Sequence, residues 1–170
     1  MKIVHREHSA YKDPVMDLYI ASFPRSSSDK IALSKYLDDF LKVENALLAI
    51  DNDQLFGALL YSPIHEDKDL PSLITENFNT QKCVYIAEMM VSENSRGKGI
   101  GGQLLESFFN NIDRNQYSDA FIRVWDQNEV AIGLYKKMGY IPYTQIDQVK
   151  TYPDGNGTFL MKKIYLHKKL

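Results

Sequence analysis

The chain has 170 residues, 44% hydrophobic and 25% charged, which excludes a disordered or collagen-like protein and fits a single domain over residues 1–170. Its 20 Lys and Arg residues nearly balance its 22 Asp and Glu residues, so the net charge of −2 argues against general nucleic-acid binding. The single cysteine, Cys83, excludes an internal disulfide and a multi-thiolate metal site. No apolar run is long enough to span a membrane and no signal-peptide core is present, so we expect a cytoplasmic protein.

The first part of the chain predicts two helices. Asp13 and Pro14 fit the N-cap and the first helical position of one helix, where a side-chain acceptor and a residue without an amide hydrogen are both favoured. Ser28 or Asp29 fits the N-cap of the second helix. The buried stripe expected on that second helix consists of Ile31, Leu33, Leu37, Phe40 and Leu41.

A hairpin and a long connection follow the two helices. Apolar runs at Ala46–Ile50 and Leu55–Tyr61 flank Asp51-Asn52-Asp53, a sequence typical of a hairpin turn. Residues 62–81 predict a long loop with a weak helix near Pro71–Asn77, and loops of this length are often functional.

The second half alternates between strands and helices. Strand, helix, strand and helix in succession predict parallel pairing in the middle of the sheet, while hairpins at both ends predict antiparallel pairing. Together they predict a mixed sheet with helices packed on it. The expected strands are Cys83–Val91, Ala120–Trp125, Tyr140–Thr151 and Thr158–Leu166, the last two joined at Asp154-Gly155-Asn156-Gly157.

A glycine-rich turn lies between the first of these strands and the next helix. The segment Ser92–Gly102 contains Arg96-Gly97-Lys98-Gly99-Ile100-Gly101-Gly102. Glycines let several backbone amides approach one anion, and the helix N-terminus adds a partial positive charge. Arg96 and Lys98 supply formal positive charge, so the turn predicts a phosphate or pyrophosphate site.

Two common phosphate-binding motifs match this turn only in part. A phosphate-binding P-loop requires Lys and then Ser or Thr after its last glycine, whereas Gly102 is followed by Gln103. The dinucleotide fingerprint matches Gly97, Gly99 and Gly102, and Asp126 ends the next strand at a suitable spacing. However, Ser92–Arg96 separates the strand from the first glycine, and the chain has only one strand-helix-strand-helix unit.

The segment Glu88–Tyr140 resembles the GNAT superfamily of N-acetyltransferases, which bind acetyl-coenzyme A. Arg96, Gly99 and Gly101 match the family's phosphate loop, and Glu88 and Val91 stand at the usual spacing before it. Glu93 departs from the Pro that many members carry. Downstream, the residues that match the family's pattern are Asn128, Ala131, Leu134, Tyr135, Gly139 and Tyr140.

The resemblance implies an α/β fold of mixed α+β type: a mainly antiparallel central sheet of about seven strands flanked by about four helices. It implies Tyr135 as a general acid for the departing thiolate and Glu88 as a base acting through water. It also implies a bulge near Met89 and Met90 whose freed backbone groups pair with the coenzyme. The implied acetyl-CoA-binding residues are Met89, Met90, Val91, Arg96, Gly97, Lys98, Gly99, Ile100, Gly101, Gly102, Asn128 and Tyr135.

Each implied role has a structural alternative. Tyr135 fits a packed core tyrosine, Asn128 fits a helix N-cap, and Glu88 fits a paired structural acid. Arg123 occupies the position where some ribosomal-protein N-terminal acetyltransferases carry a catalytic Glu, which argues against that subgroup. The four histidines show no metal spacing, so no metal site is expected.

The function expected from the resemblance is acetyl transfer from acetyl-CoA to a primary amine, carried by a small molecule or a peptide, without a covalent acyl-enzyme. A coenzyme A-binding sensor and a small dinucleotide-dependent oxidoreductase remain as alternatives. Nucleic-acid and membrane partners are not expected, and a homodimer is left open. Glu66, Asp67 and Asp69, opposed only by Lys68 in the loop, fit a solvated acidic loop or, as the alternative, a segment that attracts a cationic acceptor.

Overall fold

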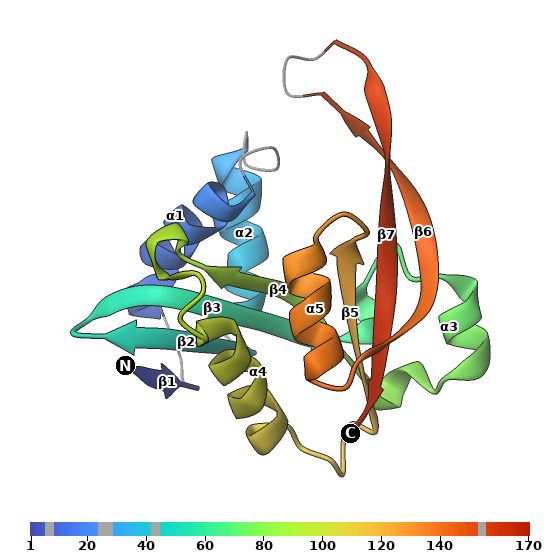
Figure 1. The fold of residues 1–170 in the computed structure, drawn as a ribbon, viewed down its shortest axis with the longest axis horizontal. Helices are drawn as coiled ribbons and strands as arrows, with labels where there is room; N and C mark the ends of the chain where they lie inside the picture. The colour runs from blue at the N-terminus through green and yellow to red at the C-terminus, as the bar shows by residue number, and fades with distance from the viewer. Residues whose placement is uncertain (6–8, 24–28, 42–44, 153–155) are drawn as a thin grey trace. The chain divides into compact units, whose positions relative to one another are not determined.

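The structure is a computed structural model that describes residues 1–5, 9–23, 29–41, 45–152 and 156–170. The chain divides into two compact units, Met1–Ser62 with Ala87–Ile112 and Pro63–Ile86 with Asp113–Leu170. The α-helices within the described ranges are α1 Lys12–Ser22, α2 Lys30–Leu41, α3 Ser72–Asn77, α4 Ile100–Asn111 and α5 Glu129–Lys137 (Figure 1). The strands are β1 Lys2–Val4, β2 Ala46–Asp51, β3 Gln54–Pro63, β4 Cys83–Val91, β5 Asp119–Trp125, β6 Ile141–Thr151 and β7 Thr158–Lys169.

The seven strands follow the hydrogen-bonded order β1-β2-β3-β4-β5-β7-β6. The pairs β1–β2, β2–β3, β5–β7 and β6–β7 run antiparallel, whereas β4 and β5 run parallel with Cys83–Ile86 opposite Asp119–Ile122. The mixed fold predicted from the alternation of elements, with its central parallel pair and its terminal hairpins, is therefore confirmed.

The two N-terminal helices differ from the prediction at their starts. Helix α1 begins at Lys12 after a 3₁₀ turn, and its N-cap is Tyr11 without a side-chain hydrogen bond, so the prediction of Asp13 as N-cap was wrong. Pro14 fits inside the first turn because amides there lack helical partners in any case. Asp29 caps α2, since its Oδ1 accepts hydrogen bonds from the amides of Ile31 and Ala32 at 3.0 Å. Ser28 lies outside the described residues.

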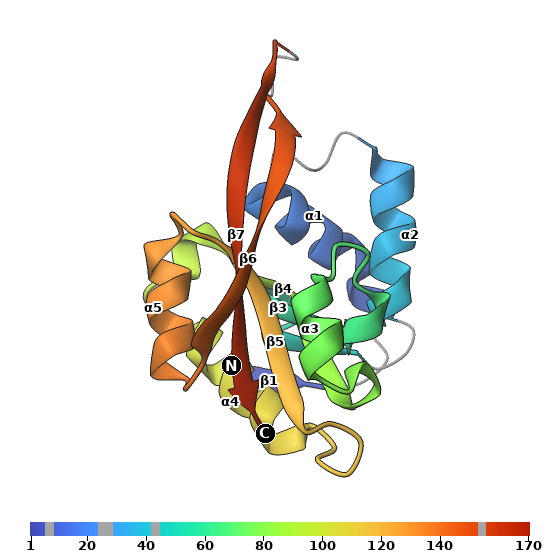
Figure 2. The same cartoon turned by 90° about the vertical axis from the view of Figure 1, so that its right-hand side faces the viewer.

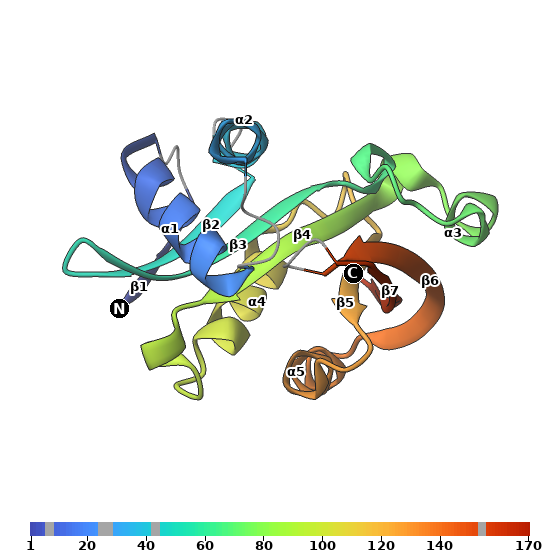
Figure 3. The same cartoon turned by 90° about the horizontal axis from the view of Figure 1, so that it is seen from above.

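In the first unit, helices lie on both faces of the strands. Figure 3 shows α1 and α2 on one side of β2 and β3, and α4 on the other. Leu33, Leu37, Phe40 and Leu41 are buried in the core shared with β2 and β3, as predicted. Ile31 is 85% exposed, so its place in that stripe was wrong. The predicted hairpin is confirmed: Asn52 and Asp53 adopt positive φ values of 46° and 60° between β2 and β3.

Gly57 of β3 makes a close approach possible in this unit. A Cβ at this position would lie 3.0 Å from the carbonyl oxygen of Met90, 3.1 Å from Cγ2 of Ile100 and 3.2 Å from Cδ1 of Leu104. The first two turns of α4 therefore pack directly on the backbone of β3. The amide of Ser92 also donates to the carbonyl of Phe56 at 2.9 Å, which fixes the chain just beyond β4.

In the second unit, β5, β7 and β6 lie between α5 and α3 (Figure 2). The predicted loop at 62–81 holds more structure than expected: β3 runs on to Pro63, 3₁₀ turns form at Ile64–Glu66 and Thr80–Lys82, and the predicted helix is present as α3. The amide of Tyr152 donates to the carbonyl of Gly157 at 3.1 Å at the end of the β6–β7 hairpin. Asp154 and Gly155 of the predicted turn lie outside the described residues.

We expect Gly57→Ala to lower the free energy of unfolding by roughly 1–3 kcal/mol, because the added methyl group overpacks a rigid backbone contact. Gly133→Ala in α5 is the matched control, since a Cβ there would meet nothing within 4 Å. It should raise the free energy of unfolding by about 0.5–1 kcal/mol through helix propensity. Urea denaturation of both variants measures the difference, and equal stability of Gly57→Ala and the unchanged chain would contradict the close approach.

Candidate functional site

Glu88 lies on β4, half-buried, and a hydroxyl from α2 reaches it. The hydroxyl of Tyr36 donates to Oε1 of Glu88 at 3.0 Å. The phenol of Tyr19 on α1 interacts electrostatically with Glu88. Burial, as the larger cause, and the negative charge of Glu88, as the smaller, raise the pKa of this phenol well above its ordinary value. The phenol of Tyr19 is therefore uncharged near neutral pH. Sequence reasoning missed both tyrosines, because no local pattern links α1 or α2 to a residue in β4.

The glycine-rich turn begins after a 3₁₀ turn at Glu93–Ser95 and ends at the N-cap of α4. Gly97 and Gly99 have φ values of 77° and 80°, a left-handed conformation that glycine adopts without steric cost. Ile100, Gly101 and Gly102 already belong to α4, so the predicted turn over Ser92–Gly102 was too long at its end.

This turn has the chemistry of an anion site. Gly99 caps α4 without a side-chain hydrogen bond, and the first amides of a helix have no partners within it. A Cβ on Gly97 would meet no atom within 4 Å, so the outer side of the turn is open. Arg96 and Lys98 are exposed beside it. Left-handed glycines, uncapped helix amides and two cations together fit a phosphate group.

A hydrogen bond from Arg96 connects the glycine-rich turn to the end of β4. Its Nε donates to the carbonyl of Val91 at 3.4 Å, a long hydrogen bond that holds the guanidinium next to β4. Met90 is 1% exposed and packs in the core of the first unit, whereas Met89 is half-buried. The bulge expected at Met89 and Met90 stays a prediction.

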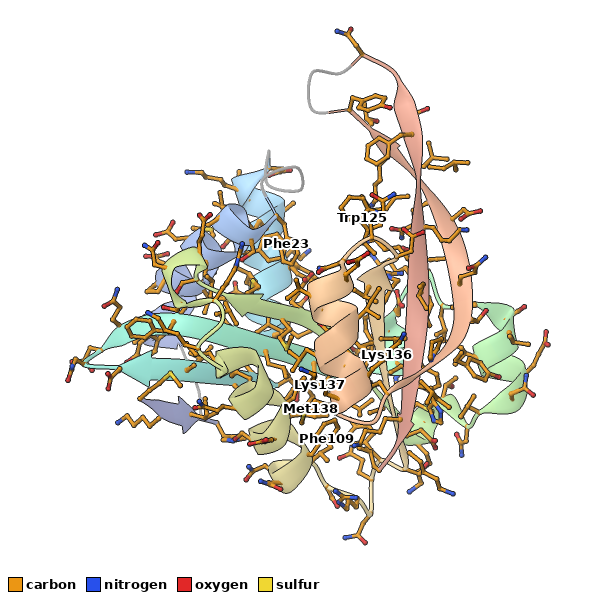
Figure 4. The ribbon with its side chains drawn as sticks, in the orientation of Figure 1. Phe23, Phe109, Trp125, Lys136, Lys137 and Met138 are labelled. Atoms are coloured by element: carbon orange, nitrogen blue, oxygen red, sulfur yellow. The ribbon has the colours of Figure 1, made fainter. Side chains whose placement is uncertain are left out.

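Asn128 and Tyr135 belong to α5 in the second unit. The side chain of Asn128 accepts a hydrogen bond from the amide of Ala131 at 3.2 Å, so its N-cap role is present. Tyr135 is 5% exposed, and its ring centroid lies 6.1 Å from that of Tyr140. Burial, followed by the neighbouring Tyr135, raises the pKa of Tyr140, which keeps that phenol neutral. Lys136 and Lys137 close the helix (Figure 4).

The acidic segment at 66–69 is held by Arg123, which sequence reasoning did not connect with it. Nη1 of Arg123 lies 3.5 Å from Oδ1 of Asp67 and 3.2 Å from Oδ2 of Asp69. The buried hydroxyl of Tyr165 donates to Asp67 at 2.6 Å and accepts from Arg123 at 3.0 Å. Lys68 is thus not the main opposing charge, and two of the three acids expected to attract a cation are engaged in this network.

Among the described residues, each of the two units has a hollow in its surface. One hollow of about 370 Å³ lies in the first unit, next to His5, Tyr61 and Phe108, and one of about 450 Å³ lies in the second, beside Trp125 and Phe159. Within the described ranges, no group of three or more His, Cys, Asp or Glu side chains could hold a metal ion. No helix among the same residues is both long and apolar enough to cross a membrane.

We expect Asp67→Asn to lower the free energy of unfolding by roughly 1–3 kcal/mol, because it weakens charged hydrogen bonds to the half-buried Arg123 and to Tyr165. Asp67 is well shielded, with a side chain only 6% exposed. Glu66→Gln changes the neighbouring, exposed acid and should alter stability by less than about 0.5 kcal/mol. Urea denaturation measures both; equal losses would show that overall charge, rather than the network, matters.

Comparisons with known proteins agree with this fold. A ribosomal-protein-alanine N-acetyltransferase from Brucella melitensis is 18% identical, with a TM-score of 0.72 and 100% of both chains covered. NAA60 of Arabidopsis thaliana, solved with a bisubstrate analogue, is 15% identical, with a TM-score of 0.72 over 99% of this chain and 98% of that one. The protein yncA of Salmonella typhimurium, solved with its cofactor acetyl-CoA, is 16% identical, with a TM-score of 0.70 over 99% and 93%.

At such low identities these structures establish the fold alone. The family follows from the sequence itself, because the model of the Acetyltransferase (GNAT) family matches residues 12–140. That match covers most of the chain and includes β4, the glycine-rich turn and α5. The protein therefore belongs to the GNAT acetyltransferase family.

Proposed function

We propose that this chain is an N-acetyltransferase that moves an acetyl group from acetyl-CoA to a primary amine by direct transfer in a ternary complex. The acceptor amine belongs to a small molecule or a peptide. The chain acts as a single domain over residues 1–170, in the cytoplasm, without nucleic-acid or membrane partners. Membership of the family supports the reaction class, and the yncA structure with its cofactor supports the choice of acetyl donor.

The observation that carries the proposal is the turn from β4 into α4. The left-handed Gly97 and Gly99 and the uncapped start of the helix form an open, positively charged cradle. Gly101 and Gly102 continue the cradle as first-turn helix residues, where small side chains let a ligand approach the backbone. The pyrophosphate of coenzyme A has the charge and size that such a cradle prefers.

The reaction needs one group that accepts a proton from the acceptor amine and another that donates a proton to the departing thiolate. When bound, acetyl-CoA supplies an activated thioester carbonyl. The acceptor arrives as an ammonium ion, which has no lone pair until it loses a proton, and Glu88 would receive that proton directly or through water. Tyr135 would donate its phenolic proton to the departing thiolate, and the proton that the attacked nitrogen loses as it becomes an amide would restore the phenol. The balanced result is an N-acetyl amine, a free thiol and one released proton.

The alternative within the same fold is a protein that binds coenzyme A without catalysis. A sensor needs the glycine turn but has no use for a phenol that donates a proton. The dinucleotide-dependent oxidoreductase is set aside, because the family match covers the glycine turn and the strand that ends before Asp126.

We expect calorimetric titration to show binding of coenzyme A and none of NAD, and Gly99→Asp to weaken that binding at least about tenfold through repulsion between two anions. Gly99→Asn separates charge from shape, because Asn is nearly isosteric and tolerates the left-handed conformation equally well. It should weaken binding much less. Gly157→Asp places the same carboxylate at another positive φ, 91°, and should leave affinity unchanged. Unchanged affinity in a folded Gly99→Asp variant would remove this turn from the binding site.

We expect Tyr135→Phe to retain coenzyme affinity and to lose turnover by about ten- to a thousandfold, as for the loss of one general acid. The assay follows thiol release from acetyl-CoA with a panel of primary amines. Tyr140→Phe is the matched control, since its ring packs beside Tyr135 and its hydroxyl has no proposed role. Full turnover in Tyr135→Phe, with the chemical step shown to limit the rate, would make Tyr135 a packing residue and favour another acid.

A further inference from the structure

The contact between Tyr36 and Glu88 joins two elements 52 residues apart in the sequence. It lies entirely within the first unit, because α2 and the second part of β4 both belong there. We propose that Tyr36 is a positioning residue for Glu88: its hydroxyl orients the carboxylate and stabilises the ionised form that accepts a proton. The catalytic consequence rests on the proposed function, whereas the contact itself does not.

Aromatic packing fixes the hydroxyl of Tyr36 in place. The ring of Tyr36 meets the ring of Phe40 edge to face at 5.1 Å and the ring of Tyr19 at 6.1 Å. Tyr19 in turn contacts Phe23, the residue after α1, with the two ring centroids 5.0 Å apart. Phe40 is 6% exposed, so this row of rings is anchored in the core. Because packing already orders the side chain of Tyr36, its hydrogen bond to Glu88 costs little additional side-chain conformational entropy.

The hydrogen bond has a predictable effect on the protonation of Glu88. A hydroxyl that donates to a carboxylate stabilises its charged form, so deleting the hydroxyl makes the carboxylate easier to protonate. Among the described residues of the two packed helices, Tyr36 on α2 donates a hydrogen bond to Glu88, and the phenol of Tyr19 on α1 interacts with its charge. A phenol is uncharged near neutral pH, so Tyr36→Phe removes a hydrogen bond without changing the formal charge around Glu88.

The decisive experiment is a pH titration of the Glu88 carboxyl by carbon-13 NMR, with Glu88→Gln to assign its signal. This readout needs no acetyl-CoA, no acceptor and no activity. We expect the midpoint in Tyr36→Phe to rise by roughly 0.5–1 pH unit, within the range that one hydrogen bond can shift. Tyr61→Phe makes the same change on another ring pair of this unit, with Phe108 at 5.2 Å, and should leave the midpoint unchanged. An unchanged midpoint in Tyr36→Phe overturns the proposal.

A second variant reverses the sign. Replacing Tyr36 with 3,5-difluorotyrosine keeps the ring and makes the hydroxyl a stronger donor, so the Glu88 midpoint should fall. A rise, or no change, would contradict the assigned contact. The Glu88 midpoint is expected to rise in one variant and to fall in the other. A small general perturbation of the fold would not produce these two opposite shifts.

Kinetics then test the catalytic part, with n-butylamine as the acceptor probe and acetyl-CoA in excess. Tyr36→Phe should lower kcat about three- to tenfold, move the acidic limb of the pH profile upward with the NMR midpoint, and leave KM for acetyl-CoA unchanged. A shifted midpoint with an unmoved limb would overturn the positioning role while leaving acetyl transfer intact. If neither wild type nor variant transfers acetyl to any amine tested, the proposed function and its catalytic consequence fail, and the titration still decides the contact.

Discussion

The absence of a side chain at Gly57 is the constraint from which the site in the first unit follows. Met90, Ile100 and Leu104 all approach the position where a Cβ would stand, so β3, β4 and α4 meet around one point. With α4 held this close, the chain between Val91 and Ile100 has little room to turn. It uses the 3₁₀ turn at Glu93–Ser95 and then the two left-handed glycines Gly97 and Gly99 before α4 begins at Ile100. The turn that we propose as the pyrophosphate site thus owes its shape to the tight packing around Gly57.

Local signals predicted most of the fold and the turn. Alternating elements, turn residues and capping residues act over a few positions, so the hairpin at Asn52, the N-caps Asp29 and Asn128, and the boundaries of β4 could be predicted from the sequence. Errors arose where tertiary structure changes a local choice. A 3₁₀ turn before Lys12 moved the start of α1 ahead of Asp13.

Polar contacts between residues far apart in the chain could not be predicted from the sequence. Arg123 is flanked by buried residues in β5, which signals that its charge needs a partner, but only the fold selects Asp67 and Asp69 from a segment more than fifty residues earlier. Tyr36 gave no signal, because it lies beside the apolar stripe of α2 and resembles an ordinary packing residue. For Arg123 the residue type predicts that a partner is needed and the topology decides which one, whereas the contact of Tyr36 follows from the topology alone.

The surroundings of Glu88 combine two opposing influences on a carboxyl group. Burial alone makes a carboxylate a stronger base by penalising its charge, and a hydroxyl donor makes it a weaker one by stabilising that charge. A base in this setting must be ionised before the ammonium arrives, yet basic enough to take its proton, which favours a balance between the two. In the proposed role of Glu88 as a base, Tyr36 preserves this balance because its hydroxyl contributes a dipole rather than a charge. A tyrosine on a packed helix is suited to this task, since it brings a hydroxyl to a half-buried acid while its ring packs against the core.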